Sequence, residues 1–416
     1  IKEAGLKNND IDLVVFAGEK AGLFHTLTKP AALFSTDDWI LQNEKYWKPK
    51  LIEKKNLTYL DDFNLFQSKI PNLKDNPYFE LIEKVKHYPE KNPFELLKDI
   101  RKKTVVKQLG ISMDKIIFIR HEECHQFYGY YSQASFRDKA LIFTIEGGGD
   151  DSSATISVAN EGKIEEKFKT NEASLGRLYR YITLLLGMKP TQHEYKVMGL
   201  APYGSRYHGE KSLNHFRKFD KVIDDKIINQ HIFTDVYYSS KAALEGQRFD
   251  GIAWGLQTYL EEILVNWVKN NVDKYKISDV ILSGGVAQNI KAMQALINID
   301  NISSLWSGPI TGDGSLAIGA AWAACKKFSN DEILAFNNIY LGSKMMKADI
   351  NKELNNNNFT VLDSYTARDV AKWISSGNIV ARCEGRMEFG QRALGNRSIL
   401  ADPRRADTVE RINNKI

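Results

Sequence analysis

The chain has 416 residues, of which 43% are hydrophobic and 26% charged, a composition typical of a globular protein with two or three domains. Its 57 basic and 52 acidic residues leave a formal net charge of +5, so we expect no nucleic-acid partner. Three cysteines are few and odd in number, which favours a reduced, cytoplasmic protein. The sequence contains no run of about 18 apolar residues, so no membrane span is expected.

Two apolar runs in the first third of the chain predict buried strands. Residues 11–17 read I-D-L-V-V-F-A and residues 115–120 read K-I-I-F-I-R, and both are rich in β-branched and aromatic residues. Between them, residues 20–110 contain aromatic clusters and helical segments such as residues 94–103. No chemical motif occurs there, so we expect packing elements around a cleft, with substrate contacts as the alternative.

A histidine pair follows the second predicted strand directly, in the motif H-E-E-C-H. His121 and His125 are four residues apart, so on a helix they share one face and can bind one metal ion. The alternative is two polar residues at a helix surface. The motif also matches the H-E-x-x-H pattern of zinc proteases, with Glu122 as the base. In zinc proteases that pattern usually lies inside an amphipathic helix, whereas here it directly follows a predicted strand. The protease interpretation is therefore the weakest one.

A third strand, residues 140–145, ends in Glu146 and three glycines. The glycines let the backbone approach a ligand, so the Glu146 carboxylate can face a cleft; the alternative is an acidic turn residue in solvent. The acids that follow, Asp150 and Asp151, are assigned to the loop. Residues 154–158 and 164–168 then predict a β-hairpin. Such a hairpin-rich sheet followed by helices is typical of one half of an actin-like or ribonuclease-H-like fold.

Further along, Ser174 is a candidate N-cap for an amphipathic helix at residues 178–186. The segment H-E-Y-K-V-M-G-L-A-P-Y-G at residues 193–204 contains Lys196, which is either a phosphate-facing lysine or part of a surface turn. Residues 205–248 are polar and uninformative, and residues 251–275 predict a long amphipathic helix.

Two glycine-flanked helix starts lie between residues 279 and 324. A strand around residues 280–282 meets Gly284 and Gly285, where the missing Cβ atoms allow close approach of a ligand and the following helix can face an anion. Asp313 lies between two glycines before an Ala-rich helix that we expect to be buried. The pair predicts two walls of a nucleotide cleft; the alternative is two ordinary glycine turns in an α/β sheet.

These motifs occur in one order along residues 110–416, and together they carry a family resemblance. In chain order they are H-x-x-x-H, the acid before glycines, S-L-G-x-L-Y, E-Y-K-V-M-G-L-A-P-Y-G, S-G-G-V-A-x-N, G-D-x-x-x-A-I-G-A-A and G-R-M-E-F-G-Q-R-A-L-G-N-R-S-I-L-A-D-P-R. The last motif is the most specific. The chain resembles the O-carbamoyltransferase family of nodulation-factor, cephamycin and aminoglycoside pathways.

The resemblance implies a two-domain α/β protein. Residues 1–338 would be an actin-like (ribonuclease-H-like, duplicated) domain similar to the tRNA threonylcarbamoyl-transfer protein. Residues 341–416 would begin an α+β domain similar to the carbamoyl-adenylate-forming domain of hydrogenase maturation proteins. The second domain would make carbamoyl adenylate from carbamoyl phosphate and ATP. The first would move the carbamoyl group to a hydroxyl of a small molecule, such as a sugar or an antibiotic.

The resemblance also assigns site residues. The metal ligands would be His121, His125, Glu146 and Asp313, a set that suits iron, with manganese or zinc as alternatives. The adenylate would be lined by Lys196, Gly284, Gly285 and Asn289. Arg392 and Arg397 would pair with phosphate, because a guanidinium fork matches its oxygens. His125 or a metal-bound group is the candidate base for the acceptor hydroxyl, and a homodimer is one possible assembly.

Three departures from the family pattern matter, and the mildest is Gln391 in place of a usual proline. Glu146 stands where the family has aspartate, which puts the ligand geometry in question. The family pattern also extends beyond both ends of the chain, so we expect a fragment that cannot complete carbamoyl-adenylate synthesis. Two other functions stay open: a tRNA-modifying relative, which lacks the appended arginine-rich motif, and a non-catalytic nucleotide-binding or regulatory protein, which loss of metal binding at Glu146 would favour.

Overall fold

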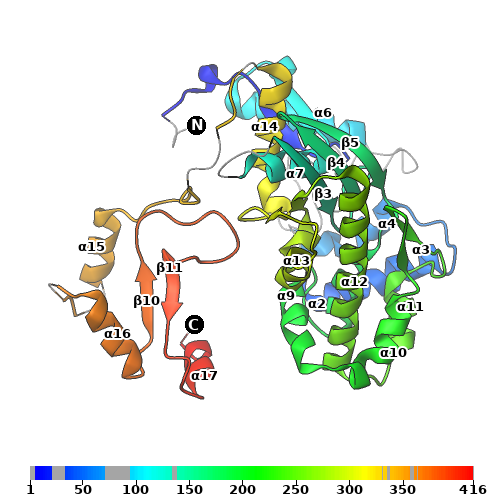
Figure 1. Cartoon of the computed structure of the whole chain (residues 1–416). Coiled ribbons are helices and arrows are strands. Elements are labelled where there is room, and N and C mark those ends of the chain that lie inside the picture. The colour runs from blue at the N-terminus through cyan, green and yellow to red at the C-terminus, as the bar shows by residue number, and fades with distance from the viewer. Residues whose placement is uncertain are drawn as a thin grey trace. The chain divides into compact units, whose positions relative to one another are not determined.

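A computed structural model describes residues 5–20, 33–70, 94–133, 138–329, 331–334, 338–356, 360–362 and 364–415. The chain divides into two compact units, Ile1–Ala335 and Phe336–Ile416 (Figure 1). Among the described residues, no helix is both long enough and apolar enough to cross a membrane.

A five-stranded sheet organises the first unit. Its strands lie in the order β5-β4-β3-β8-β9, with bounds β3 Lys139–Ile145, β4 Ala154–Asn160, β5 Lys163–Thr170, β8 Asp279–Ser283 and β9 Ser304–Trp306. β3, β8 and β9 are parallel, whereas β4 is antiparallel to both of its neighbours. This order and these directions are those of one ribonuclease-H-like half of an actin-like fold. The expected α/β fold class is thereby confirmed.

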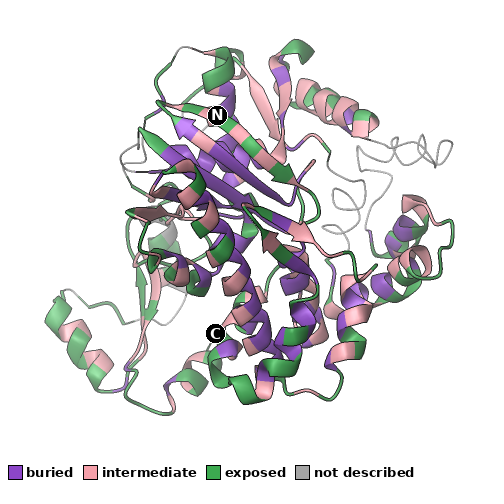
Figure 2. Ribbon diagram, turned by 45° about the vertical axis from the view of Figure 1, so that its right-hand side comes forward, coloured by how far each residue is buried: buried purple, intermediate pink, exposed green. Residues whose placement is uncertain are grey.

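Alternate residues of β3 enter two different hydrophobic cores. Leu141, Phe143 and Ile145 pack with α12 (Phe249–Tyr275), where Phe143 meets Trp267 with ring centroids 4.9 Å apart. Ala140 and Ile142 pack on the opposite side, against α7 (His121–Tyr131) and α14 (Leu316–Phe328). Figure 2 shows the buried residues concentrated in the sheet and the helices beside it. Because both faces are covered, the strand reads as a continuous apolar run.

Close packing of α7 on α14 explains the small residues of the Ala-rich helix. A Cβ atom at Gly319 would lie 1.9 Å from the carbonyl oxygen of Cys124, so only glycine fits. Ala320 and Ala323 are buried at this contact, whereas Ala317 and Ala321 are exposed. The helix is therefore buried on one face only, which corrects the expectation that the whole helix is buried.

The first unit also contains elements outside this sheet. A short parallel pair joins β1 to β2, and β2 leads into α7. A separate small core includes Phe63, Leu97 and Leu184. The other bounds are β1 Val14–Ala17, α2 Thr36–Gln42, α3 Lys48–Leu51, α4 Tyr59–Phe66, α6 Phe94–Leu109, β2 Ile116–Ile119, α8 Leu175–Leu185, α9 Glu194–Leu200, α10 Arg206–Phe216, β6 Asp220–Ile223, β7 Lys226–Asn229, α11 Val236–Leu244 and α13 Ile290–Ile297.

Ser174 is the N-cap residue of α8, as predicted, but its side chain makes no capping hydrogen bond. α8 begins at Leu175, and the backbone N–H and hydroxyl of Ser174 both donate to Asp220 Oδ2, over 2.7 and 2.8 Å. Asp220 is buried at the start of β6, inside the stretch that appeared uninformative in sequence. The serine therefore ties the start of α8 to a distant strand, because a buried carboxylate needs donors.

The second unit is built on one antiparallel strand pair, β10 (Val380–Cys383) with β11 (Arg397–Leu400). The described helices of this unit are α15 (Lys347–Asn356), α16 (Ala367–Ser375) and α17 (Thr408–Asn413). At α16, Thr366 and Asp369 form a capping box, which satisfies N–H groups at the helix start.

Candidate metal centre

The two histidines lie on successive turns at the start of α7. β2 ends at Ile119, and α7 begins at His121. The backbone N–H of His121 donates to Asp150 Oδ2 over 2.8 Å, and the same carboxylate accepts from the N–H groups of Glu19 and Lys20, each over 2.7 Å. Asp150, assigned only to a loop from sequence, thus fixes the segment after β1 to the start of α7. His125, one turn further, is completely buried.

Two carboxylates come from neighbouring parts of the sheet edge. Glu146 directly follows β3, and its backbone N–H donates to the carbonyl of Ser153 over 2.9 Å. Asp313 begins the turn before α14. A Cβ atom at Gly312, the preceding residue, would lie 2.3 Å from Gln288 Nε2, so a side chain there would require the Gln288 amide to move.

The four side chains converge on one point. Glu146 Oε2 lies 2.9 Å from His121 Nε2, and its Oε1 lies 3.4 Å from His125 Nε2. Asp313 Oδ1 lies 3.6 Å from His121 Nε2 and 3.8 Å from His125 Nε2. One ligand atom from each residue can be chosen so that all lie within 4.8 Å of one another. Glu146, which has one methylene more than aspartate, lies close to both imidazoles.

The charges of the group shift the pKa values in opposite directions. Burial opposes the charged form of His125, but the carboxylates of Glu146 and Asp313 outweigh it and raise the pKa of His125 to about 9. Burial likewise disfavours the ionised form of Glu146, but His125 and His121 lower its pKa well below the ordinary value. The nearby imidazole of His125 lowers the pKa of Asp313. The carboxylates are therefore ionised and ready to act as ligands.

The donor set fits a divalent metal ion. His125 Nε2 is buried without a hydrogen-bond partner, which is costly unless a ligand satisfies the nitrogen. Two imidazole nitrogens and two carboxylates are a ligand set that iron, manganese and zinc accept. The other ring nitrogen, His125 Nδ1, lies 3.5 Å from Ser283 Oγ at the end of β8. A second contact of this kind orients a ligating imidazole.

Glu122 is not part of this group of four. Its Oε2 accepts from the backbone N–H of Asp150 over 3.2 Å, and its Oε1 lies 3.4 Å from Arg120 Nη1. Burial raises the pKa of Glu122. The Glu122 carboxylate thus contacts the loop after β3 and Arg120. This position does not support Glu122 as the base of a zinc-protease site.

The predicted adenylate-lining residues have different surroundings. Gly284 has φ +93°, and a Cβ atom there would lie 2.5 Å from the carbonyl oxygen of Ile145, so its close contact is with β3. Gly285 has open space where a Cβ atom would be. Lys196 is exposed on α9. Of these positions, Gly285 best matches a backbone that a ligand can approach.

Asn289 is held by a partner that sequence reasoning missed. Its Oδ1 accepts from the backbone N–H of Ala292 at the start of α13 over 3.0 Å and from Gln257 Nε2 over 3.0 Å. Its Nδ2 donates to Gln257 Oε1 over 2.8 Å, and the Tyr179 hydroxyl donates to the same oxygen over 2.8 Å. The amide of Asn289 therefore shapes the turn after β8. Sequence patterns did not predict this contact, because Gln257 lies 32 residues before Asn289 and no local motif in α12 distinguishes it.

The predicted arginines lie in the second unit and are described there alone. Arg392 is exposed in the loop between β10 and β11. The guanidinium of Arg397 donates to the backbone carbonyls of Glu384, Asn396 and Gly385, over 2.8, 2.7 and 3.2 Å. In this conformation Arg397 holds the backbone around Gly385, and its role toward phosphate stays a prediction.

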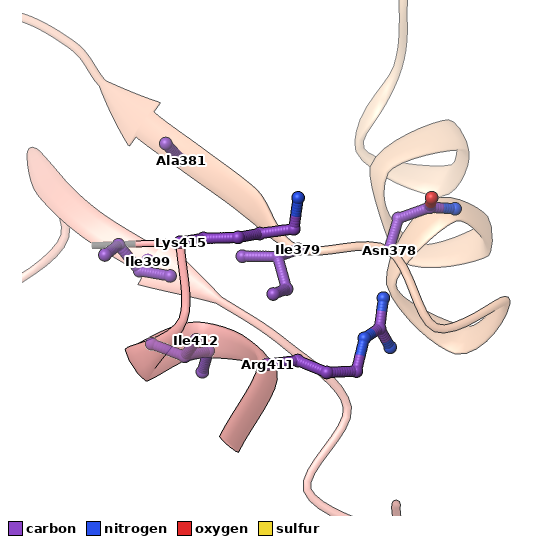
Figure 3. Close-up of a pocket in the computed structure, with 7 residues that line it drawn as sticks. All are labelled: Asn378, Ile379, Ala381, Ile399, Arg411, Ile412 and Lys415. Atoms are coloured by element: carbon purple, nitrogen blue, oxygen red, sulfur yellow. The ribbon is translucent and has the colours of Figure 1, made fainter. Parts of the chain in front are cut away.

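A cavity of 380 Å³ also lies in the second unit, between the β10–β11 pair and α17 (Figure 3). Apolar side chains line much of it, and polar groups come from Arg411, Lys415 and Asn378; the lining residues are Asn378, Ile379, Ala381, Ile399, Arg411, Ile412 and Lys415. Neither Arg392 nor Arg397 takes part. The cavity is therefore not formed by the predicted phosphate-binding arginines.

Fold and site together define an α/β protein with a His₂–carboxylate₂ group at one sheet edge, and comparison with known families gives the class. A family model described as "Carbamoyltransferase N-terminus" matches residues 1–322, and one described as "Carbamoyltransferase C-terminus" matches residues 371–416. The chain belongs to the carbamoyltransferase family, which confirms the resemblance seen in the sequence.

Individual relatives agree with this family. "Uncharacterized protein MJ1058" of Methanocaldococcus jannaschii is 27% identical over 99% of this chain and 71% of its own length. "Nodulation protein NolNO" of Sinorhizobium fredii is 30% identical over 74% of this chain and 47% of its own length. "3'-hydroxymethylcephem-O-carbamoyltransferase" of Streptomyces clavuligerus is 30% identical over 32% of this chain and 24% of its own length. The chain thus spans only about half the length of NolNO.

Among solved structures, full-length HypF in its phosphate- and nucleotide-bound form is similar to this chain with a TM-score of 0.38 and 14% identity. That similarity covers 55% of this chain and 38% of HypF.

Proposed function

We propose that the protein is an ATP-dependent O-carbamoyltransferase that uses carbamoyl phosphate and transfers the carbamoyl group to a hydroxyl of a small molecule, such as a sugar, an antibiotic or another natural product. The convergence of His121, His125, Glu146 and Asp313, inside the part of the chain that the carbamoyltransferase N-terminal family matches, is the observation that carries the proposal. The name of the cephem relative, an O-carbamoyltransferase, supports the choice of a hydroxyl acceptor.

The proposed reaction has two steps. In the first, one water molecule hydrolyses carbamoyl phosphate to carbamate and phosphate, and a carbamate oxygen then bonds to the α-phosphorus of ATP as pyrophosphate leaves, which gives carbamoyl adenylate. The acceptor oxygen then bonds to the carbamoyl carbon, the bond between that carbon and the adenylate oxygen breaks, and AMP leaves. The acceptor proton must pass to a base. Arg392 is proposed to bind phosphate in the first step, since a guanidinium fork matches phosphate oxygens.

In the second step, the four-residue group would hold a divalent ion, with iron first and manganese or zinc as alternatives. Such an ion would supply Lewis-acid polarisation of the adenylate phosphate. His125 is better suited to be a ligand than the base, because its imidazole is completely buried. Open backbone at Gly285 is available to the nucleotide.

The test is pyrophosphate release from labelled ATP by the full-length protein, with and without carbamoyl phosphate and ferrous iron. We expect release that requires carbamoyl phosphate and is lost in Arg392→Ala. ATP binding without any such release would contradict the proposal and favour a binding or regulatory role.

A further inference from the structure

Arg180 is a half-buried cation beside Gly147, the residue that follows the candidate ligand Glu146. It lies on α8, four residues after Gly176, so both face the same side of the helix. Side chains on a helix lean toward its N-terminus, which directs Arg180 back toward the turn that carries Gly176. In the described part of the chain, no hydrogen bond or ion pair of its guanidinium is found.

The packing of α8 on the loop after β3 places this guanidinium. A Cβ atom at Gly176 would lie 2.4 Å from the backbone nitrogen of Gly147 and 2.5 Å from the carbonyl carbon of Glu146. The helix therefore touches the backbone of the loop directly. A Cβ atom at Gly147 would lie 2.7 Å from Arg180 Nη2 and 3.2 Å from its Cζ. The absence of a side chain at Gly147 thus opens the space that the guanidinium occupies, one residue from the ligand Glu146.

The net charge of the four candidate ligands explains why a cation beside them would help to bind an anion. Two ionised carboxylates, Glu146 and Asp313, would cancel the charge of a divalent ion bound by the four residues. An anionic ligand at that ion would then gain little net attraction from the ligand set. A guanidinium is always charged, is weakly hydrated and fits phosphate oxygens with two parallel hydrogen bonds. Arg180 supplies this additional positive charge, because its guanidinium lies beside Gly147, next to Glu146.

We infer that Arg180 binds a phosphate group of the substrate held at the metal-ligand group. The inference deepens the proposed function and rests on it for the identity of the phosphate, which would be that of the adenylate. It adds a first-unit arginine to a phosphate-binding set that the sequence placed at Arg392, Arg397 and Lys196.

The experiment compares AMP with adenosine, its uncharged counterpart, by calorimetry on the manganese-loaded full chain. In the wild type, AMP should bind more tightly than adenosine. Arg180→Gln should weaken AMP binding roughly tenfold or more, as expected when a charge-assisted hydrogen bond is lost, and leave adenosine binding unchanged. Arg180→Lys should keep part of the preference. Arg206→Gln, an exposed arginine paired with Glu210, is the control with the same change in charge.

Two results would overturn the inference: equal affinity of wild type and Arg180→Gln for AMP, or a wild type that binds AMP no better than adenosine. Manganese affinity, measured on the same samples, should be equal in both proteins, since Arg180 is not a ligand. An AMP preference that depends on Arg180, without carbamoyl-phosphate-dependent pyrophosphate release, would leave this inference standing while the proposed function fails.

Discussion

At the scale of single residues, the coupling between imidazoles and carboxylates decides what the candidate centre can bind. Glu146 is nearly inaccessible yet ionised, since two histidines face its oxygens. His125 in turn carries a raised pKa because two carboxylates face it. In the absence of metal, the two imidazoles therefore hold their protons more strongly than usual, and a metal ion must displace these protons.

The first prediction concerns this competition. Since the pKa of His125 is raised to about 9, its Nε2 is protonated at pH 7 in the metal-free protein. Metal binding at pH 7 should therefore release a proton, and the apparent affinity should rise with pH until about pH 9 and then level off. Calorimetry in buffers of different ionisation enthalpy counts the released protons. An affinity that does not change between pH 7 and pH 9 would refute the assignment of His125 as a ligand.

At the scale of elements, α8 is fixed at both sides of its first turn. Ser174 donates to the buried Asp220, and Gly176 rests on the backbone of Glu146 and Gly147. Burial raises the pKa of Asp220 even though Ser174 and Asn229 donate to it. Helix α8, which carries Arg180, is thus positioned by the hydrogen bonds to the Asp220 carboxylate and by the close packing that Gly176 allows.

The second prediction tests that packing. Gly176→Ala would place a methyl group 2.4 Å from backbone that cannot move without displacing Glu146, so the unfolding free energy should fall by about 1–3 kcal/mol and metal binding should weaken. Gly199→Ala is the matched control. Its Cβ atom would meet nothing within 4 Å, so the substitution in α9 should be neutral or stabilise by up to about 1 kcal/mol.

Urea unfolding of both variants measures the two changes, and similar effects at the two positions would count against the packing argument.

The third prediction concerns α10, where His215 is buried among Phe216, Phe219 and Phe233. Burial, together with nearby Lys218, lowers the pKa of His215 to about 4, against an ordinary value of 6.5. A base whose folded-state pKa is lowered stabilises the fold fully above pH 6.5, and this contribution is lost as the pH falls from 6.5 to about 4.

Between pH 7.5 and pH 5, the wild type should therefore lose about 2 kcal/mol more unfolding free energy than His215→Gln. Exposed His231 provides the control, and His231→Gln should keep the wild-type dependence on pH. Parallel pH profiles of wild type and His215→Gln would show that the buried imidazole does not titrate as argued.

At the scale of the whole molecule, the sequence predicts what is local and leaves out what joins distant segments. The apolar runs of β3 and β8, the glycines beside Glu146 and Asp313 and the helical spacing of His121 and His125 are local patterns. The family resemblance then groups the four candidate ligands, which local patterns alone do not do. Strand order and side chains paired across the fold have no local signal.

Three such pairings were missed for this reason. Asp220 accepts from Ser174 across 46 residues, Gln257 pairs with Asn289 across 32 residues, and Asp150 accepts from Glu19 across 131 residues. Each partner is an ordinary polar residue in an unremarkable stretch. Their roles follow only from the folded backbone, which brings a buried acceptor to its donors.

We predict that His121, His125, Glu146 and Asp313 form one metal centre. Its most direct test is equilibrium dialysis of the full chain against ferrous iron, manganese or zinc, followed by measurement of bound metal per chain. The account predicts one tightly bound ion per chain, lost or weakened at least roughly tenfold in Asp313→Asn and in His121→Gln and unchanged in the exposed control His231→Gln. A wild type that binds no ion, or ligand variants that bind it as tightly as the wild type, would contradict the account.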